Sequence, residues 1–220
     1  MDMAPAGIAL AQGADDRDGL EMDVLDVRLG PVLPRWPAGL VLGCRLHGDV
    51  IGEAEASRVD SGHVQRSNSE GSRRAWQCDH ILDVLALAGW PRAAGQARRA
   101  RDALLTEAAE AEEVTALLFK LHDTVRRSWV LRWSLRDLGV LSIEQLRSRD
   151  LPLDWTGDTY DRLLNRIHHA RSGIETPPSS ADVIDALPAI VTGLDVAAAR
   201  LVIASLGIDV ALDRQASQHG

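Results

Sequence analysis

The sequence contains a single lysine, Lys120, among 24 basic residues, so arginine carries nearly all of its positive charge. Guanidinium groups are suited to bidentate pairing with carboxylates, although a compositional bias alone would give the same count. The net charge of −8 argues against a nonspecific nucleic-acid-binding protein, because such proteins neutralise phosphates with a positive surface. We therefore expect no nucleic-acid partner.

Cysteine is almost as scarce, with only Cys44 and Cys78. Two cysteines that form no CxxC motif cannot by themselves complete a zinc site or hold an iron–sulfur cluster, so we interpret them as buried thiols in a reducing compartment.

The motifs GxSxG, GxxxxGK, GxGxxG and HExxH are also missing, and the seven histidines show no metal-ligand spacing. We assign no catalytic, cofactor-binding or metal-binding residue, and we find no support for an independent enzyme.

Long hydrophobic runs are missing as well. The longest apolar stretch, Leu194 to Leu212, is interrupted by three charged residues and is not expected to span a bilayer. The amino terminus carries aspartates in place of the basic and apolar regions of a secretory signal. We expect a cytoplasmic protein that reaches the inner face of a membrane only through partners.

Alternating apolar residues predict a small antiparallel sheet over residues 21–58. Leu40, Leu42, Cys44 and Leu46 occupy every second position, which is typical of a strand with one buried face. His47-Gly48 then supplies a tight turn, because glycine adopts the positive φ that hairpin turns require. A further strand is expected from Met22 to Leu29, ahead of a proline-rich loop.

The apolar spacing changes from two to three and four at Trp76, which predicts helices. We interpret residues 1–20 as a mobile arm, 59–74 as a linker and 75–215 as a helical bundle of six or so helices. The expected helices cover Trp76–Ala88, Arg92–Glu107, Glu110–Leu135, Ser142–Arg147, Asp158–Ile174, Ala181–Ala189 and Asp195–Ser205. Strands followed by helices along a chain of 220 residues indicate the α+β class.

Arginines cluster around the carboxyl end of the expected helix Glu110–Leu135. The cluster consists of Arg126, Arg127, Arg132 and Arg136. The simplest interpretation is a solvated face, and the alternative is a surface that docks an acidic partner or orients a guanidinium near a cofactor of another protein. Two tryptophans four residues apart, Trp129 and Trp133, are interpreted as core packing near that face.

The loop and hairpin from Gly30 to Glu55, GPVLPRWPAGLVLGCRLHGDVIGEAE, carry a recognisable pattern. This segment resembles the amino-terminal loop and hairpin of the hydrogenase-like subunit of NADH:quinone oxidoreductase (complex I), a relative of the [NiFe]-hydrogenase large subunit, with the pattern GPxHPxxHGxLxLxxxxxGExI. The loop residues Gly30, Pro31 and Pro34 are in register. Leu33 and Pro37 stand where the pattern has histidines.

Two later segments resemble the same family, in the same order. Gly157 to Ile174 is similar to its helix GDxxxRxxxRxxExxxSI, with Asp158, Arg162 and Arg166 in register and His169 at the position of an acid. Asp195 to Arg214 is similar to its carboxy-terminal DxxxxxxSxDxxxxxxDR. The chain thus resembles a shortened and divergent member of this hydrogenase-like family.

The resemblance implies a component of a membrane-associated quinone- or hydrogenase-type oxidoreductase complex that packs against an iron–sulfur subunit. In the family, a loop histidine and a tyrosine bind the quinone, and leucine and proline side chains at the loop positions cannot donate a hydrogen bond. We therefore expect no cofactor bound by this chain alone, with a cluster in the partner and quinone nearby. Asp158, Arg162 and Arg166 are the candidate interface residues. The alternative is a soluble, non-catalytic interaction or scaffold protein that retains only the fold.

Overall fold

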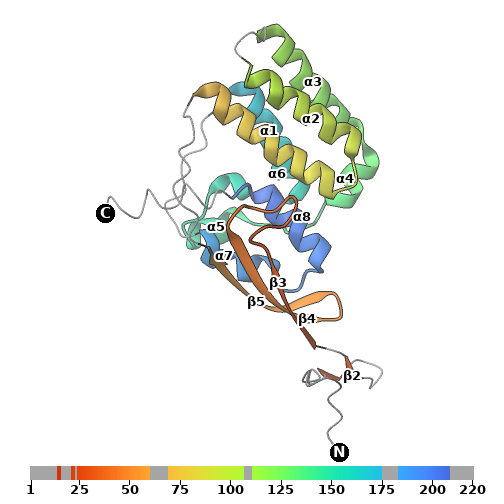
Figure 1. Ribbon diagram of the computed structural model, residues 1–220, viewed down its shortest axis with the longest axis vertical. Coiled ribbons are helices and arrows are strands. Elements are labelled where there is room, and N and C mark those ends of the chain that lie inside the picture. Colours follow the sequence, from red (N-terminus) through yellow and green to blue (C-terminus); the bar gives the residue numbers. More distant parts are fainter. Residues whose placement is uncertain are drawn as a thin grey trace, which may run out of the picture.

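The computed structural model describes residues 14–15, 21–22, 24–59, 69–106, 111–174 and 183–208. A sheet precedes the helices along the chain, so the predicted α+β class is confirmed. Figure 1 shows helices α1, α2 and α3 stacked at one end of the molecule and the sheet toward the other. The interpretation of residues 1–20 as a mobile arm lies outside the described residues, except where a two-residue strand β1 (Ala14–Asp15) pairs with β2 (Glu21–Met22).

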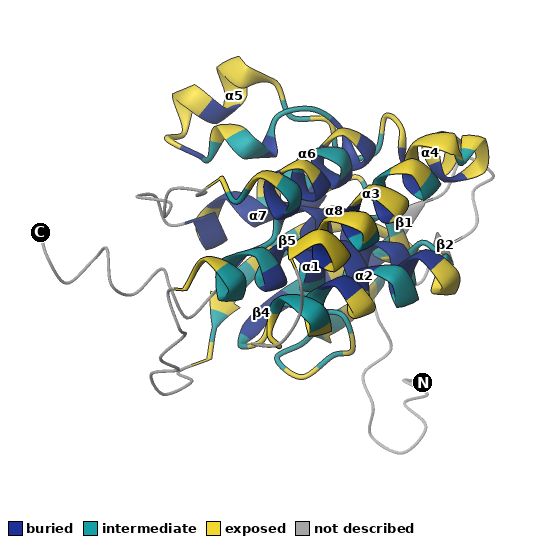
Figure 2. Cartoon of the chain, turned by 90° about the horizontal axis from the view of Figure 1, so that it is seen from above, coloured by how far each residue is buried: buried dark blue, intermediate teal, exposed yellow. Residues whose placement is uncertain are grey.

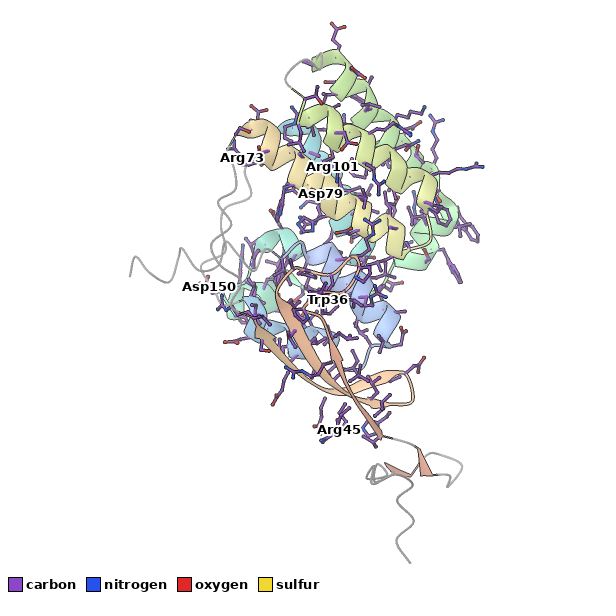
Figure 3. All side chains as sticks on the ribbon, viewed as in Figure 1. Trp36, Arg45, Arg73, Asp79, Arg101 and Asp150 are labelled. Carbon is purple, nitrogen blue, oxygen red and sulfur yellow. The ribbon has the colours of Figure 1, made fainter. Side chains whose placement is uncertain are left out.

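The main sheet has three antiparallel strands in the order β3 (Val24–Leu29), β4 (Leu40–His47) and β5 (Val50–Arg58). The predicted buried face is confirmed, because the side chains at positions 40, 42, 44 and 46 are all buried. The alternation fails at the start of β4, where Val41 on the other face is buried as well. Gly48 has φ 64° in the turn between β4 and β5. On the opposite face, Arg45 forms ion pairs with Asp26 on β3 at 3.2 Å and Glu53 on β5 at 3.0 Å (Figure 3).

The helices of the described ranges follow the sheet. They are α1 (Glu70–Leu87), α2 (Pro91–Leu104), α3 (Ala111–Arg127), α4 (Trp129–Leu135), α5 (Ile143–Ser148), the short 3₁₀ helix η2 (Leu153–Trp155), α6 (Thr159–Ser172), α7 (Val183–Val191) and α8 (Val196–Leu206). Helix caps explain several boundaries. Ser142 and Gln145 form the predicted capping box at α5, and Gly173 ends α6 in the left-handed conformation.

The expected linker over 59–74 was wrong at its carboxyl end. Helix α1 begins at Glu70, because the Ser69 side chain accepts a hydrogen bond from the Ser72 amide at 3.2 Å. The first turn of α1 is polar and partly exposed, so it lacked the apolar spacing that marked Trp76 as the start. Residues 60–68 lie outside the described residues.

The expected continuous helix over 110–135 was also wrong. Ser128 has extended backbone angles and caps α4 through its Oγ, which accepts from the Leu131 amide at 3.2 Å. The chain therefore bends between α3 and α4. Trp129 and Trp133 on α4 point into solvent, with 70% and 72% of their surfaces exposed. The interpretation of these tryptophans as core packing was therefore wrong.

Two groups of buried apolar side chains make up the core. One lies among α1, α2, α3, α4 and α6. The other lies between the sheet and α5, η2, α7 and α8. Helix α8 contributes Ala204 to the first group and Ile203 to the second, so it lies between them. Figure 2 shows the buried residues on the inward faces of these helices.

Candidate functional site

The three segments that carry the sequence pattern meet at α8. The hairpin contacts the start of this helix. The Val196 amide donates to the Asp49 carbonyl at 3.1 Å, and the Ile51 amide donates to the Leu194 carbonyl at 2.9 Å. Loop 30–39 and α6 also contact α8. Residues more than 160 positions apart in the sequence thus form one junction, with α8 at its centre (Figure 1).

Loop 30–39 closes onto the first residue of β4. The Gly30-Pro31 peptide bond is cis, and Gly30 has φ 88°. A Cβ atom at Gly30 would lie 2.1 Å from the Leu40 carbonyl oxygen, so only glycine fits here. The same carbonyl accepts a hydrogen bond from Trp36 Nε1 at 2.9 Å. Trp36 lies between the sheet and the helices (Figure 3).

Two arginines attach the loop to the helices. Arg200 of α8 donates to the Pro34 carbonyl at 2.9 Å, and Arg35 pairs with Asp83 of α1 at 3.0 Å. Burial raises the pKa of the Asp83 carboxyl, and Arg35 opposes that rise. The loop is thereby held on two helices while Val32 at its tip stays 94% exposed.

The two loop positions at which the family pattern has histidines hold packing residues. Leu33 is partly buried against the core between the sheet and α8. The Pro37 carbonyl accepts from the Leu40 amide at 3.1 Å and closes the turn into β4. Both positions therefore contribute to the packing and closure of the loop.

Arg162 of α6 is only 1% exposed, and its guanidinium is surrounded by oxygen atoms. Nε donates to Ser205 Oγ on α8 at 2.8 Å, and Nη2 donates to Thr159 Oγ1 at 3.1 Å. Nη1 faces three carbonyl oxygens, those of Gly139 at 2.9 Å, Trp155 at 3.2 Å and Gly157 at 2.7 Å. This one side chain therefore joins the segment before α6 to α8.

Arg166 lies one turn further along α6 and binds the carboxyl end of α8. Its Nε donates to the Ser205 carbonyl at 2.8 Å, and Nη2 donates to the Leu206 carbonyl. Nη1 donates to Gln77 Oε1 of α1 at 3.0 Å. The last carbonyls of a helix have no partner within the helix, so Arg166 supplies a donor to the buried Ser205 carbonyl and a second donor to the Leu206 carbonyl, which also accepts from Trp155 Nε1 at 2.9 Å.

Burial lowers the pKa of Arg162 and of Arg166 to about 10. Asp158 and Asp161 oppose the shift at Arg162, and Asp154 opposes it at Arg166. Both guanidiniums therefore stay charged at neutral pH. The partial negative charge at the carboxyl end of α8 stabilises them there.

Asp158, the third candidate interface residue, caps α6. Its Oδ1 accepts from the Asp161 amide at 2.9 Å, and its Oδ2 accepts from the Asp137 amide at 3.0 Å. The structure thus brings Asp158, Arg162 and Arg166 together inside the chain, all less than 9% exposed. A role for these residues at an interface with another protein stays a prediction.

The sequence did not reveal three partners of these arginines, namely Gln77, Ser205 and Gly207. A Cβ atom at Gly207 would approach the Arg166 guanidinium to 2.2 Å, so the glycine leaves room for it. Gln77 and Ser205 are isolated polar residues on apolar helical faces, 5% and 0% exposed. That pattern was the available signal for a buried polar network.

Within the described ranges, no group of three or more His, Cys, Asp and Glu side chains is placed to hold a metal ion. Across the same residues, no helix has the length and the hydropathy that crossing a membrane requires. No family model and no curated protein matches the chain. The resemblance to the hydrogenase-like family of complex I consequently stays a prediction from its motifs.

Proposed function

We propose that this chain is a component of a membrane-associated oxidoreductase complex, similar to the hydrogenase-like subunit of complex I, and that it packs against an iron–sulfur subunit without supplying catalytic residues of its own. The observation that carries the proposal is the junction at α8. The three segments whose motifs resemble the family, far apart in the sequence, contact one another there through the Arg200–Pro34, Val196–Asp49 and Arg166–Ser205 hydrogen bonds.

The loop in this junction has the properties of a contact surface. Val32 is 94% exposed, and the neighbouring loop residues are held by Arg200 and Asp83. An apolar tip on a fixed loop loses little conformational freedom when a partner covers it. In the proposed complex, the loop lies against the iron–sulfur subunit, which carries the cluster, and any quinone binds near that interface.

The alternative is a non-catalytic interaction or scaffold protein that retains only the fold. The burial of Arg162 and Arg166 favours this second function, because both guanidiniums hydrogen-bond to this chain's own oxygens. A polar contact with a cofactor in another protein would require them to leave those partners. The two functions therefore differ in the identity of the partner.

Purification of the full, affinity-tagged chain from its native cells in mild detergent tests the proposal. We expect mass spectrometry to identify an iron–sulfur subunit in the purified complex. The variant Val32→Asp is expected to lower recovery of that subunit by about tenfold, because it places a charge at the contact. Ile143→Asp is a matched control, since Ile143 is 46% exposed at the first position of α5, where an acid is tolerated.

Recovery of partners that include no iron–sulfur subunit would overturn the proposal. A stable complex with proteins of another class would then support the scaffold function. Equal losses for Val32→Asp and Ile143→Asp would show that loop 30–39 is not the contact.

A further inference from the structure

Helix α4 leaves its aromatic side chains in solvent. Trp129 and Trp133 are 70% and 72% exposed, and Val130 between them is 48% exposed. Leu131 and Leu135 on the same helix are completely buried. Helix α4 is therefore held on the bundle by one face and presents two tryptophans, one turn apart, on the other. Figure 2 shows this helix at the edge of the molecule, with mostly exposed residues.

The neighbouring backbone holds these tryptophans in place. Ser128 caps the helix, and Arg132 Nη2 donates to the Arg126 carbonyl of α3 at 3.3 Å. The Arg132 guanidinium also lies 5.7 Å from the centre of the Tyr160 ring on α6. Large, rigid side chains on a fixed helix lose little entropy when a partner covers them.

Arginines surround the tryptophans. Arg126 and Arg127 end α3, Arg132 lies within α4, and Arg136 follows it, all of them exposed. Of these four, only Arg127 has an ion pair within the described ranges, with Asp123 at 2.9 Å. The chain as a whole carries a net charge of −8, so this cationic area is opposite in sign to the net charge.

We propose that this α4 surface, made of Trp129, Val130, Trp133 and the four arginines, docks a protein that presents an apolar pocket ringed by carboxylates. Tryptophan and arginine are the residues most enriched at the energetic centres of protein interfaces, and lysine is depleted there. The pocket would receive the indole rings, and its rim of carboxylates would pair with the exposed guanidiniums, chiefly those of Arg126 and Arg136. This inference does not rest on the proposed function, because it uses none of the residues of loop 30–39.

An anionic lipid surface is the competing occupant. Helices that lie in a membrane interface present a long apolar face, whereas α4 has seven residues and presents only three apolar side chains. Its cations are all guanidiniums, which match the planar geometry of carboxylates. Both features favour a protein partner.

Site-specific crosslinking tests the proposal. A photoreactive phenylalanine analogue replaces Trp133 in the full chain in native cells, and the same analogue at Leu105, 58% exposed after α2, is the control. We expect irradiation to give a protein adduct at position 133 and none at position 105. The partner identified by mass spectrometry is then purified, and its affinity for the chain is measured at about 50 mM and about 300 mM salt.

Three variants decide whether the contact is the predicted one. Trp129→Ala with Trp133→Ala is expected to weaken binding by at least about tenfold. Arg126→Glu with Arg136→Glu is expected to weaken it similarly and to remove most of its salt dependence. Arg98→Glu with Arg99→Glu makes the same charge change on the exposed face of α2, and we expect it to change the affinity by less than about twofold.

Several results would overturn the proposal. These are the absence of an adduct at position 133, an adduct only with a second copy of this chain, and binding of the purified chain to phosphatidylglycerol vesicles without a protein adduct. Equal weakening by the α2 control would show that only overall charge matters. Thermal melting of each variant excludes unfolding as the cause.

Discussion

Arg166 on α6 donates a hydrogen bond from Nε to the carbonyl oxygen of Ser205 on α8 at 2.8 Å. The same guanidinium contacts Gln77 on α1, so one side chain connects three helices. Because α8 also packs against the sheet, this contact links the two parts of the core. Loss of this side chain should therefore affect the whole fold.

We expect Arg166→Met to lower the free energy of unfolding by at least about 3 kcal/mol. The methionine fills part of the space but removes the Arg166 hydrogen bonds to the Ser205 carbonyl and the Gln77 side chain. It also leaves the buried Leu206 carbonyl with only the donor from Trp155 Nε1. Urea unfolding measures the loss, and Arg98→Met on the exposed face of α2 should change stability by less than about 0.5 kcal/mol. A loss below about 1 kcal/mol for Arg166→Met would mean that the residue is available for an external partner.

Gly207→Ala should destabilise the chain by more than the conformational cost of placing alanine at a left-handed glycine position. Gly207 has φ 61°, and an added Cβ would also meet the Arg166 guanidinium at 2.2 Å. Gly89 follows α1 with φ 76° and open space around its Cβ position, so Gly89→Ala measures the conformational cost alone, about 1–2 kcal/mol. Urea unfolding should give a cost at Gly207 that is larger by at least about 1 kcal/mol. Equal costs would show that Arg166 moves away freely.

Stability should fall as the pH decreases below about 6.5 because of His169 on α6. Burial lowers the pKa of His169, with Arg166 and His168 acting in the same direction and Asp154 opposing them. The unfolded chain then binds the proton more readily than the folded chain, so stability is full above the unfolded pKa and decreases toward the folded pKa, by up to about 1.4 kcal/mol per pH unit.

Urea unfolding between about pH 7.5 and pH 5 checks this prediction. His169→Gln should have a shallower decline than the unmodified chain. The neighbouring exposed residue provides the control, and His168→Gln should retain the decline. Equal declines of stability with pH for His169→Gln and His168→Gln would contradict the assignment to His169.

Cys78 should resist alkylation in the folded chain. Its side chain is completely buried on α1, and burial raises the pKa of its thiol to about 12. At pH 8 it should react at least about a thousandfold more slowly than an unfolded thiol, whose pKa is about 8.5. Mass spectrometry after iodoacetamide treatment of Cys44→Ala, with and without urea, isolates Cys78. Rapid native labelling would indicate local opening of α1.

Much of the fold could be predicted from local patterns. Alternating apolar residues marked β4, and the Ser142 and Gln145 pair marked the start of α5. These features depend on the backbone and on side chains within a few residues, so the sequence contains them directly. The break at Ser128 was missed because a single serine inside an apolar periodicity is also compatible with a continuous helix.

The sequence by itself determined the α+β class, the hairpin at Gly48 and the position of Arg162 and Arg166 on one side of a helix. Only the tertiary structure decided that these two arginines are buried against α8, and that Trp129 and Trp133 face solvent. Helical spacing tells which residues share a face, but the element that covers the face depends on contacts between distant segments. Here α8, more than thirty residues beyond Arg166, covers the charged face of α6, and no described element covers the aromatic face of α4.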